Sequence, residues 1–117
     1  MWQQNGSAKK MNYQEALSWI TNLNLDVFAG YDDWRLPTLE EALSLMESEE
    51  KNGLKINNLF SNKQDTIWTS DRTKVQIEDQ KSNNPQYKYL AWYVSFNYGC
   101  FLIETETLHY IRAVRSV

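Results

Sequence analysis

The sequence predicts a single α+β domain in which two helices pack on one face of a twisted antiparallel β-sheet. Three observations support this fold class. Two stretches in the first half carry apolar residues at helical spacing, the last third alternates as strands do, and a tight turn separates two of those strands. A length of 117 residues suits one domain with one hydrophobic core. We therefore treat residues 1–117 as one domain.

Composition excludes several classes of protein. Apolar residues make up 42% of the chain, which is typical of a globular domain. Aromatic residues make up 14%, so some aromatic rings are expected on the surface, where they favour recognition. The net charge is −3 and no basic cluster is present, which argues against nucleic acid as a partner. The single cysteine, Cys100, excludes an internal disulfide and a cysteine-based zinc cluster. No apolar run approaches about 18 residues, so no insertion into a membrane is expected.

The first helix is predicted over residues 12–23. Asn12 is a favourable N-cap, and Glu15 follows at the spacing of a capping box. The apolar residues that recur at helical spacing are Tyr13, Ala16, Leu17, Ile20 and Leu23.

The second helix is predicted to begin after the turn formed by residues 30–38. Pro37 favours an extended residue before it, Thr38 is an N-cap, and Glu41 completes a second capping box. Several glutamates between positions 47 and 50 oppose the helix dipole, so this helix is expected to fray there and end before Gly53. Arg35 is expected to be a structural guanidinium that bonds carbonyl groups and a carboxylate beneath the turn.

The remaining chain is predicted to be mainly β. Residues 71–88 are polar and lack a period, so they are expected to form a long functional loop. Gly99 is the expected left-handed residue of a tight turn at positions 97–99. The expected strands are 2–4, 66–70, 91–96, 100–105 and 108–115, and 55–63 is expected to be irregular.

Four segments of the chain resemble the Lcl C-terminal domain family, named after a bacterial collagen-like adhesin. They are Asp33-Trp34-Arg35-Leu36-Pro37-Thr38 before an acidic helix, Trp68-Thr69-Ser70, Ala91-Trp92-Tyr93-Val94-Ser95-Phe96-Asn97-Tyr98-Gly99, and Tyr110-Ile111-Arg112-Ala113-Val114-Arg115. The resemblance implies a C-type-lectin-like fold, related to that of the formylglycine-generating enzymes, with paired terminal strands and residues 71–88 as its long loop. The residues given structural roles are Trp34, Arg35, Pro37, Trp68, Trp92 and Arg112.

The sequence gives little support for a catalytic site or a metal site. His109 is the only histidine and lacks nearby cysteines, so we expect a surface strand residue and no metal site. Cys100 lacks the second cysteine that the formylglycine-generating enzymes use, so the chain is expected not to be an enzyme. Glu78-Asp79 and Asn83-Asn84-Pro85 invite comparison with a lectin calcium loop, but the full oxygen set is missing. No cofactor is therefore expected, with calcium as the alternative.

The function expected is a non-catalytic recognition module that binds a glycan or a protein surface. Exposed rings can stack on sugars or anchor a protein partner. The residues proposed for ligand binding are Tyr93, Tyr98, Leu102, Glu104, His109 and Tyr110. Three alternatives stay open, as the resemblance implies: a hypervariable receptor of a diversity-generating retroelement, a regulatory or structural domain of a larger kinase-linked protein, and an enzyme of the formylglycine-generating type.

Overall fold

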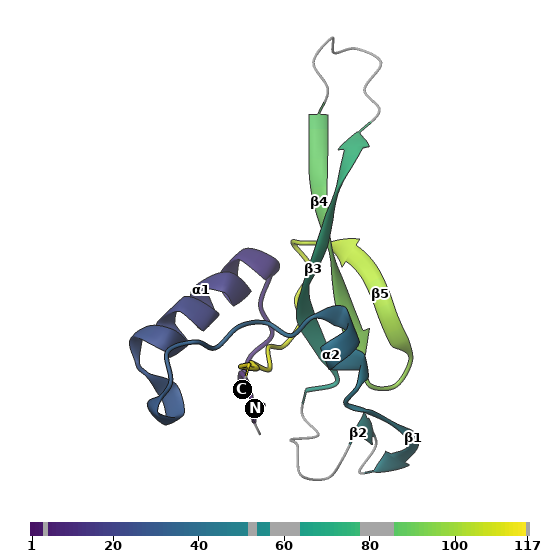
Figure 1. Ribbon diagram of the computed structural model, residues 1–117. Coiled ribbons are helices and arrows are strands. Elements are labelled where there is room, and N and C mark those ends of the chain that lie inside the picture. The colour runs from purple at the N-terminus through teal and green to yellow at the C-terminus, as the bar shows by residue number, and fades with distance from the viewer. Residues whose placement is uncertain (4, 52–53, 57–63, 78–85, 117) are drawn as a thin grey trace.

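The computed structural model describes residues 1–3, 5–51, 54–56, 64–77 and 86–116. These described residues form two α-helices, one 3₁₀ helix, a two-stranded antiparallel sheet and a three-stranded antiparallel sheet (Figure 1). The elements are α1 (Tyr13–Leu25), η1 (Phe28–Gly30), α2 (Leu39–Leu43), β1 (Met46–Lys51), β2 (Leu54–Ile56), β3 (Thr66–Ile77), β4 (Gln86–Ser95) and β5 (Gly99–Glu104). This arrangement confirms the α+β class.

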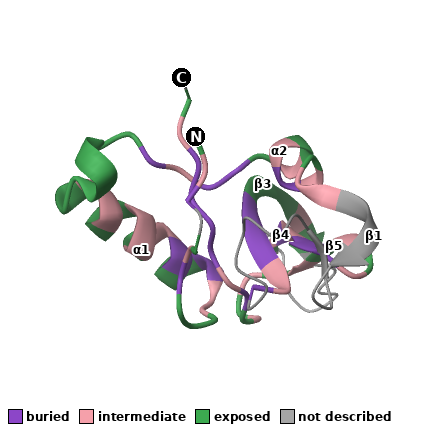
Figure 2. Cartoon of the chain, turned by 90° about the horizontal axis from the view of Figure 1, so that it is seen from below, coloured by how far each residue is buried: buried purple, intermediate pink, exposed green. Residues whose placement is uncertain are grey.

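Helix α1 begins as its capping signals predict. The amide of Glu15 donates to Asn12 Oδ1 over 2.9 Å, and the amide of Asn12 donates to Glu15 Oε1 over 3.1 Å. This reciprocal box satisfies two amides that a helix start leaves without partners. Only Tyr13 and Ala16 of α1 are buried. Figure 2 shows that the end of α1 farthest from the sheet is exposed.

A strained turn follows α1. Val27 (φ 51°) and Ala29 (φ 55°) both adopt the left-handed conformation, which is unfavourable for residues with a Cβ atom. Asn24 connects the end of α1 to the chain that follows the turn. Its side-chain amide donates to Trp34 O over 2.9 Å and accepts from Trp34 N over 2.8 Å. The Trp34 indole also donates to Phe28 O over 2.9 Å. The tertiary structure therefore imposes a backbone that the local sequence resists.

Ala29→Gly is expected to raise the free energy of unfolding by about 1 kcal/mol, since glycine adopts a left-handed conformation without steric cost. Urea unfolding monitored by tryptophan fluorescence measures the change. Ala8→Gly is the matched control, because Ala8 is exposed and has no positive φ. A gain no larger than that of Ala8→Gly would contradict the strain assigned to Ala29.

The second helix starts as predicted but is shorter. Thr38 and Glu41 form the expected capping box, and α2 then ends at Leu43. The helix was predicted to fray at residues 47–50 and to end before Gly53. It ends earlier than that, because β1 starts at Met46 and pairs with β2 in an antiparallel hairpin. Carboxylates at the negative end of a helix dipole disfavour further turns. Part of the stretch expected to be irregular is strand β2, and residues 57–63 lie outside the described residues.

The prediction of a loop over residues 71–88 was also wrong for its described part. Strand β3 continues to Ile77 and pairs with β4 from Arg72↔Ala91 to Ile77↔Gln86, after an irregularity between Trp68 and Arg72. The far half of this ribbon extends beyond β5, whose pairing with β4 stops at Leu90↔Glu104. The described side chains of the far half are exposed or half-buried, so both of its faces reach solvent. Residues 78–85 lie outside the described residues.

The two helices cover opposite faces of the sheet, which corrects the expectation of a single covered face. Helix α1 packs in one core cluster with Trp68 and Ala91, whereas α2 packs in the other with Ile67 and Val94. Successive residues of a strand point to opposite faces, so neighbours such as Ile67 and Trp68 serve different clusters. The hairpin turn after β4 is as predicted, with Gly99 at φ 113°.

The two ends of the chain lie together, as the resemblance implies. Trp2 and Val114 form an antiparallel bridge, and Val114 also bridges Arg35. The expected strand over 108–115 is not a strand of the sheet: it forms isolated bridges instead, including Met11↔His109 and a parallel bridge from Ile67 to Tyr110. The C-terminal segment is thereby inserted between the N-terminal segment and β3.

With one exception, the residues given structural roles are buried or bonded within the fold. Trp34, Pro37, Trp68 and Arg112 are buried, and Arg112 Nη1 donates to Gln3 O over 2.9 Å. Arg35 binds the Glu41 carboxylate with both terminal nitrogens, at 2.6 and 2.9 Å, and donates to Leu36 O over 3.3 Å. Trp92, by contrast, is only half-buried and belongs to neither described core cluster, because it points to the sheet face beyond the part that α2 covers.

Candidate functional site

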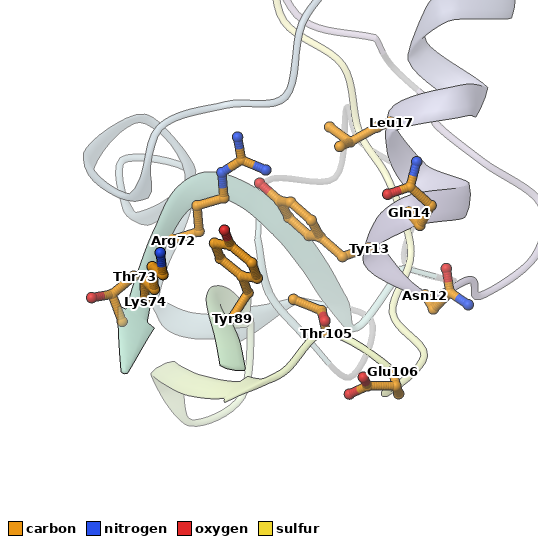
Figure 3. A pocket seen from close by; sticks show the side chains of 10 residues that line it. All are labelled: Asn12, Tyr13, Gln14, Leu17, Arg72, Thr73, Lys74, Tyr89, Thr105 and Glu106. Carbon is orange, nitrogen blue, oxygen red and sulfur yellow. The ribbon is translucent and has the colours of Figure 1, made fainter. Parts of the chain in front are cut away.

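A polar groove of about 520 Å³ lies between the first turns of α1 and the far half of the β3–β4 ribbon. Figure 3 shows side chains from both walls pointing into it, with Tyr13, Gln14 and Leu17 on the helix side and Arg72 and Tyr89 on the strand side. Thr105 and Glu106 line it from the turn after β5. The volume falls in the range of small-molecule sites.

Tyr13 fixes the helix wall of the polar groove. Its amide donates to Thr105 O over 2.9 Å, and its hydroxyl donates to Thr69 O over 3.0 Å. Its ring meets the edge of Trp68 at a centroid distance of 5.2 Å. Burial raises the pKa of the Tyr13 phenol, against the opposing effect of the nearby Arg72 charge. The hydroxyl therefore stays protonated, and the wall is anchored to both the sheet and the turn after β5.

The strand wall is assembled by the register of β3 and β4. After the irregularity in β3, Arg72 lies opposite Ala91 and Lys74 lies opposite Tyr89, so Arg72, Lys74 and Tyr89 share the face on which α1 lies. Tyr89 is 54% exposed. Lys74 Nζ lies 4.1 Å from the centroid of the Tyr87 ring, a cation–π geometry. The strand wall thus carries accessible rings next to cations.

The electrostatic character of the polar groove is cationic on its strand side. Arg72 and Lys74 both line it, and neither forms an ion pair within the described part of the chain. Glu106 is the one carboxylate among the described lining residues, and it lies in the turn after β5. An anionic group near Arg72 would find a guanidinium that no described carboxylate neutralises.

A second, apolar groove of about 430 Å³ continues along α1. It shares Tyr13, Leu17 and Arg72 with the polar groove. The further residues that line it are Ile20, Arg35, Leu36, Thr38 and Ser70. The side chains of Leu17, Ile20 and Leu36 make this groove the more apolar of the two.

The family model of the Lcl C-terminal domain matches residues 1–115. The chain belongs to the Lcl C-terminal domain family. Comparisons with curated proteins and with solved structures gave no significant match. The resemblance identified from the four sequence segments is therefore confirmed.

The structure of this Lcl C-terminal domain does not bring the six predicted ligand residues together. Leu102 and Glu104 lie on the face away from α1, and Tyr98 lies at the tip of the hairpin turn. Tyr93 and Tyr110 are half-buried against the two core clusters. Tyr93, Leu102 and Glu104 lie on strands as predicted, whereas His109 and Tyr110 form isolated bridges, and the sheet is covered on both faces.

His109 corrects the expectation of an outward surface residue. It is 9% exposed, its ring stacks on Tyr93 at a centroid distance of 3.9 Å, and Trp68 meets it edge-on at 4.7 Å. Its Nδ1 lies 2.8 Å from Thr66 Oγ1. Burial, and secondarily the charge of Lys10, lowers the pKa of His109 to about 4. The imidazole is consequently neutral and structural, because the C-terminal segment runs inside the fold.

The groove residues of this Lcl C-terminal domain were missed because they fell within the expected loop. Arg72, Lys74 and Tyr89 all lie between positions 71 and 88 or directly after them. The signal that could have found them is the placement of Val75 and Ile77 at alternate positions, followed by Tyr87 and Tyr89 at alternate positions. That this region takes part in ligand binding stays a prediction, whereas the loop predicted for its backbone was wrong over the described residues.

Other chemistry is sparse among the described residues. No group of three or more His, Cys, Asp or Glu side chains could hold a metal there, and the residues compared with a calcium loop lie outside the described residues. Cys100 is a half-buried free thiol packed against the cluster beneath α2. In the described ranges, no helix has the length and apolarity needed to cross a membrane.

Proposed function

We propose that this Lcl C-terminal domain is a non-catalytic recognition module that binds a carbohydrate carrying a carboxylate or sulfate in the polar groove. The observation that carries the proposal is the exposed Tyr89 ring beside Arg72 on the strand wall. An aromatic ring packs against the apolar face of a sugar, and a guanidinium binds an oxyanion with paired hydrogen bonds.

The helix wall supports this assignment with neutral polar groups. Asn12 and Gln14 carry side-chain amides at the groove, and an amide both donates to and accepts from sugar hydroxyls. Glycoside hydrolysis ordinarily uses two carboxyl groups that flank the scissile bond. Of the described residues that line the groove, Glu106 alone supplies a carboxylate, which favours binding over hydrolysis.

The C-type-lectin-like fold is also part of this proposal. The paired ends of the chain at Trp2 and Val114, the two helices and the three-stranded antiparallel sheet support it. A crystal structure would decide the matter, and a sheet with different strand connections would contradict it.

Tyr89→Ala and Arg72→Gln are each expected to weaken carbohydrate binding at least tenfold, since each loss removes about 1.4 kcal/mol or more. The measurement is an array of neutral, uronate-bearing and sulfated glycans, followed by calorimetric titration of the best glycan and of its uncharged counterpart. Arg72→Gln is expected to erase the preference for the charged form, whereas Tyr89→Ala is expected to weaken both.

Tyr98→Ala is the matched control, because Tyr98 is 83% exposed on the hairpin turn and does not line the groove. It is expected to bind as the wild type does. Binding to no glycan on the array, or loss of binding in Tyr98→Ala alone, would overturn the proposal. Mass spectrometry of the recovered glycan tests the non-catalytic part, which cleavage would contradict.

A further inference from the structure

The strained turn after α1 projects a small apolar knob, which we define as residues 25–31. Leu25 is 74% exposed, Val27 49% and Phe28 44%. In Figure 1 this turn lies at the end of the molecule away from the sheet, and Figure 2 shows the same end as exposed. Large apolar side chains gathered in so few residues at one exposed end are typical of an interaction site.

The knob is held rigidly, as a recognition element should be. Its base is fixed by the Asn24–Trp34 pair of hydrogen bonds, and Gly30 N and Tyr31 N donate within the turn to Val27 O and Phe28 O. Val27 keeps a left-handed conformation that places a β-branched side chain in the exposed turn. Strain that the surrounding structure maintains is a recognised pointer to function.

Charge identifies the kind of surface that the knob fits. Asp26 lies among the apolar side chains and Asp32 directly follows the knob; both are exposed and form no ion pair within the described part of the chain. The Arg115 guanidinium, which lies over the Tyr31 ring, is already paired with Asp33. An acidic rim around an apolar centre calls for an apolar recess with a cationic rim.

The apolar groove of the same molecule has these properties. Leu17, Ile20 and Leu36 line it, and the Arg72 guanidinium, which has no ion pair among the described residues, borders it. Its volume of about 430 Å³ is enough to receive side chains of the size of Val and Phe. Both features lie on accessible parts of one chain.

We propose that the knob of one copy docks in the apolar groove of a second copy of this chain. The contact joins two different surfaces, so it is heterologous: in a pair, one copy keeps a free groove and the other copy keeps a free knob. Arg72 borders both grooves, so the knob and a charged carbohydrate would compete for the same guanidinium. The small size of the two features gives a weak, concentration-dependent association.

Sedimentation equilibrium over micromolar to millimolar concentrations tests the contact. The wild-type average mass is expected to rise with concentration. A knob variant, Leu25→Ser/Val27→Asn, and a groove variant, Ser70→Trp, are each expected to lose at least tenfold in association. Asn tolerates the left-handed conformation at position 27, and Ser70 is an exposed residue that lines the apolar groove only, so neither change should unfold the domain.

Mixing the two variants gives the decisive result. The knob variant keeps an intact groove and the groove variant keeps an intact knob, so the mixture is expected to form a 1:1 dimer although neither variant associates alone. Tyr98→Ser is expected to associate as the wild type does. A wild type that stays monomeric throughout, variants that still associate alone, or a mixture that stays monomeric would each overturn the proposal. Unchanged glycan binding by Ser70→Trp keeps this test separate from that of the proposed function.

Discussion

Gly6→Ala is expected to lower the free energy of unfolding by about 3 kcal/mol or more. An added Cβ would lie 2.3 Å from Gln64 Nε2 and 2.3 Å from Ile111 O. Gly6 also has a φ of +69°, which strains any residue with a side chain. The methyl group can be placed only by moving a buried backbone carbonyl.

The contacts that Gly6 permits explain the size of the effect. Gln64 is 1% exposed, and its side-chain amide donates to Ser7 O over 2.7 Å and to Ile111 O over 3.0 Å. Ser7 N donates to Ile111 O over 2.8 Å, and Ile111 N donates to Ser7 Oγ over 3.0 Å. Separating these segments leaves buried donors and acceptors without partners, at about 1–3 kcal/mol each.

Denaturant unfolding measures the cost, with Gly30→Ala as the control. Gly30 has a similar φ of +84°, but an added Cβ there would meet nothing within 4 Å. The control is therefore expected to lose only the conformational part, about 1–2 kcal/mol. Equal losses in the two variants would contradict the close contact at Gly6.

The second large effect is acid destabilisation through His109. Its folded-state pKa of about 4 lies below the ordinary value of 6.5, so the unfolded chain takes up the proton first as the pH falls. The stability that the neutral His109 contributes is fully present above pH 6.5, and it is lost progressively as the pH falls from 6.5 to 4. The wild type is expected to lose about 2 kcal/mol between pH 7.5 and pH 5.

His109→Phe is expected to remove most of this pH dependence. Phenylalanine can keep the stacking on Tyr93 and the edge contact with Trp68 but cannot be protonated. Urea unfolding of both proteins at the two pH values is the measurement. Because His109 is the only histidine, no second imidazole titrates in this window. Glu41, whose pKa Arg35 lowers to about 2, accounts for losses at lower pH. A variant that loses as much as the wild type would contradict the buried imidazole.

Local signals in the sequence predicted the parts of the fold that local interactions decide. The capping boxes at Asn12 and Thr38 and the turn at Gly99 depend on residues at most a few positions apart. The pairing of Trp2 with Val114 is a long-range contact and came from the family resemblance instead. Motifs that span nearly the whole chain thus supplied what periodicity could not.

The features that the sequence did not reveal depend on long-range packing. His109 is polar by type and becomes buried only because Tyr93 and Trp68 enclose it from other elements. Ile67 and Trp68 are adjacent apolar residues that point to opposite faces, but only the packing of α1 and α2 shows which element covers each face. Arg72 and Tyr89 become a candidate site only when β3 and β4 pair opposite α1.

The central claim is that the groove between α1 and the β3–β4 ribbon is the ligand site. The most direct test is a heteronuclear NMR titration of the domain with the charged glycan that binds best on the array. Saturable shift changes are expected at Tyr13, Arg72, Lys74 and Tyr89, and they should weaken at high salt. Changes centred on Tyr98 and Leu102, or no saturable change at all, would contradict the claim.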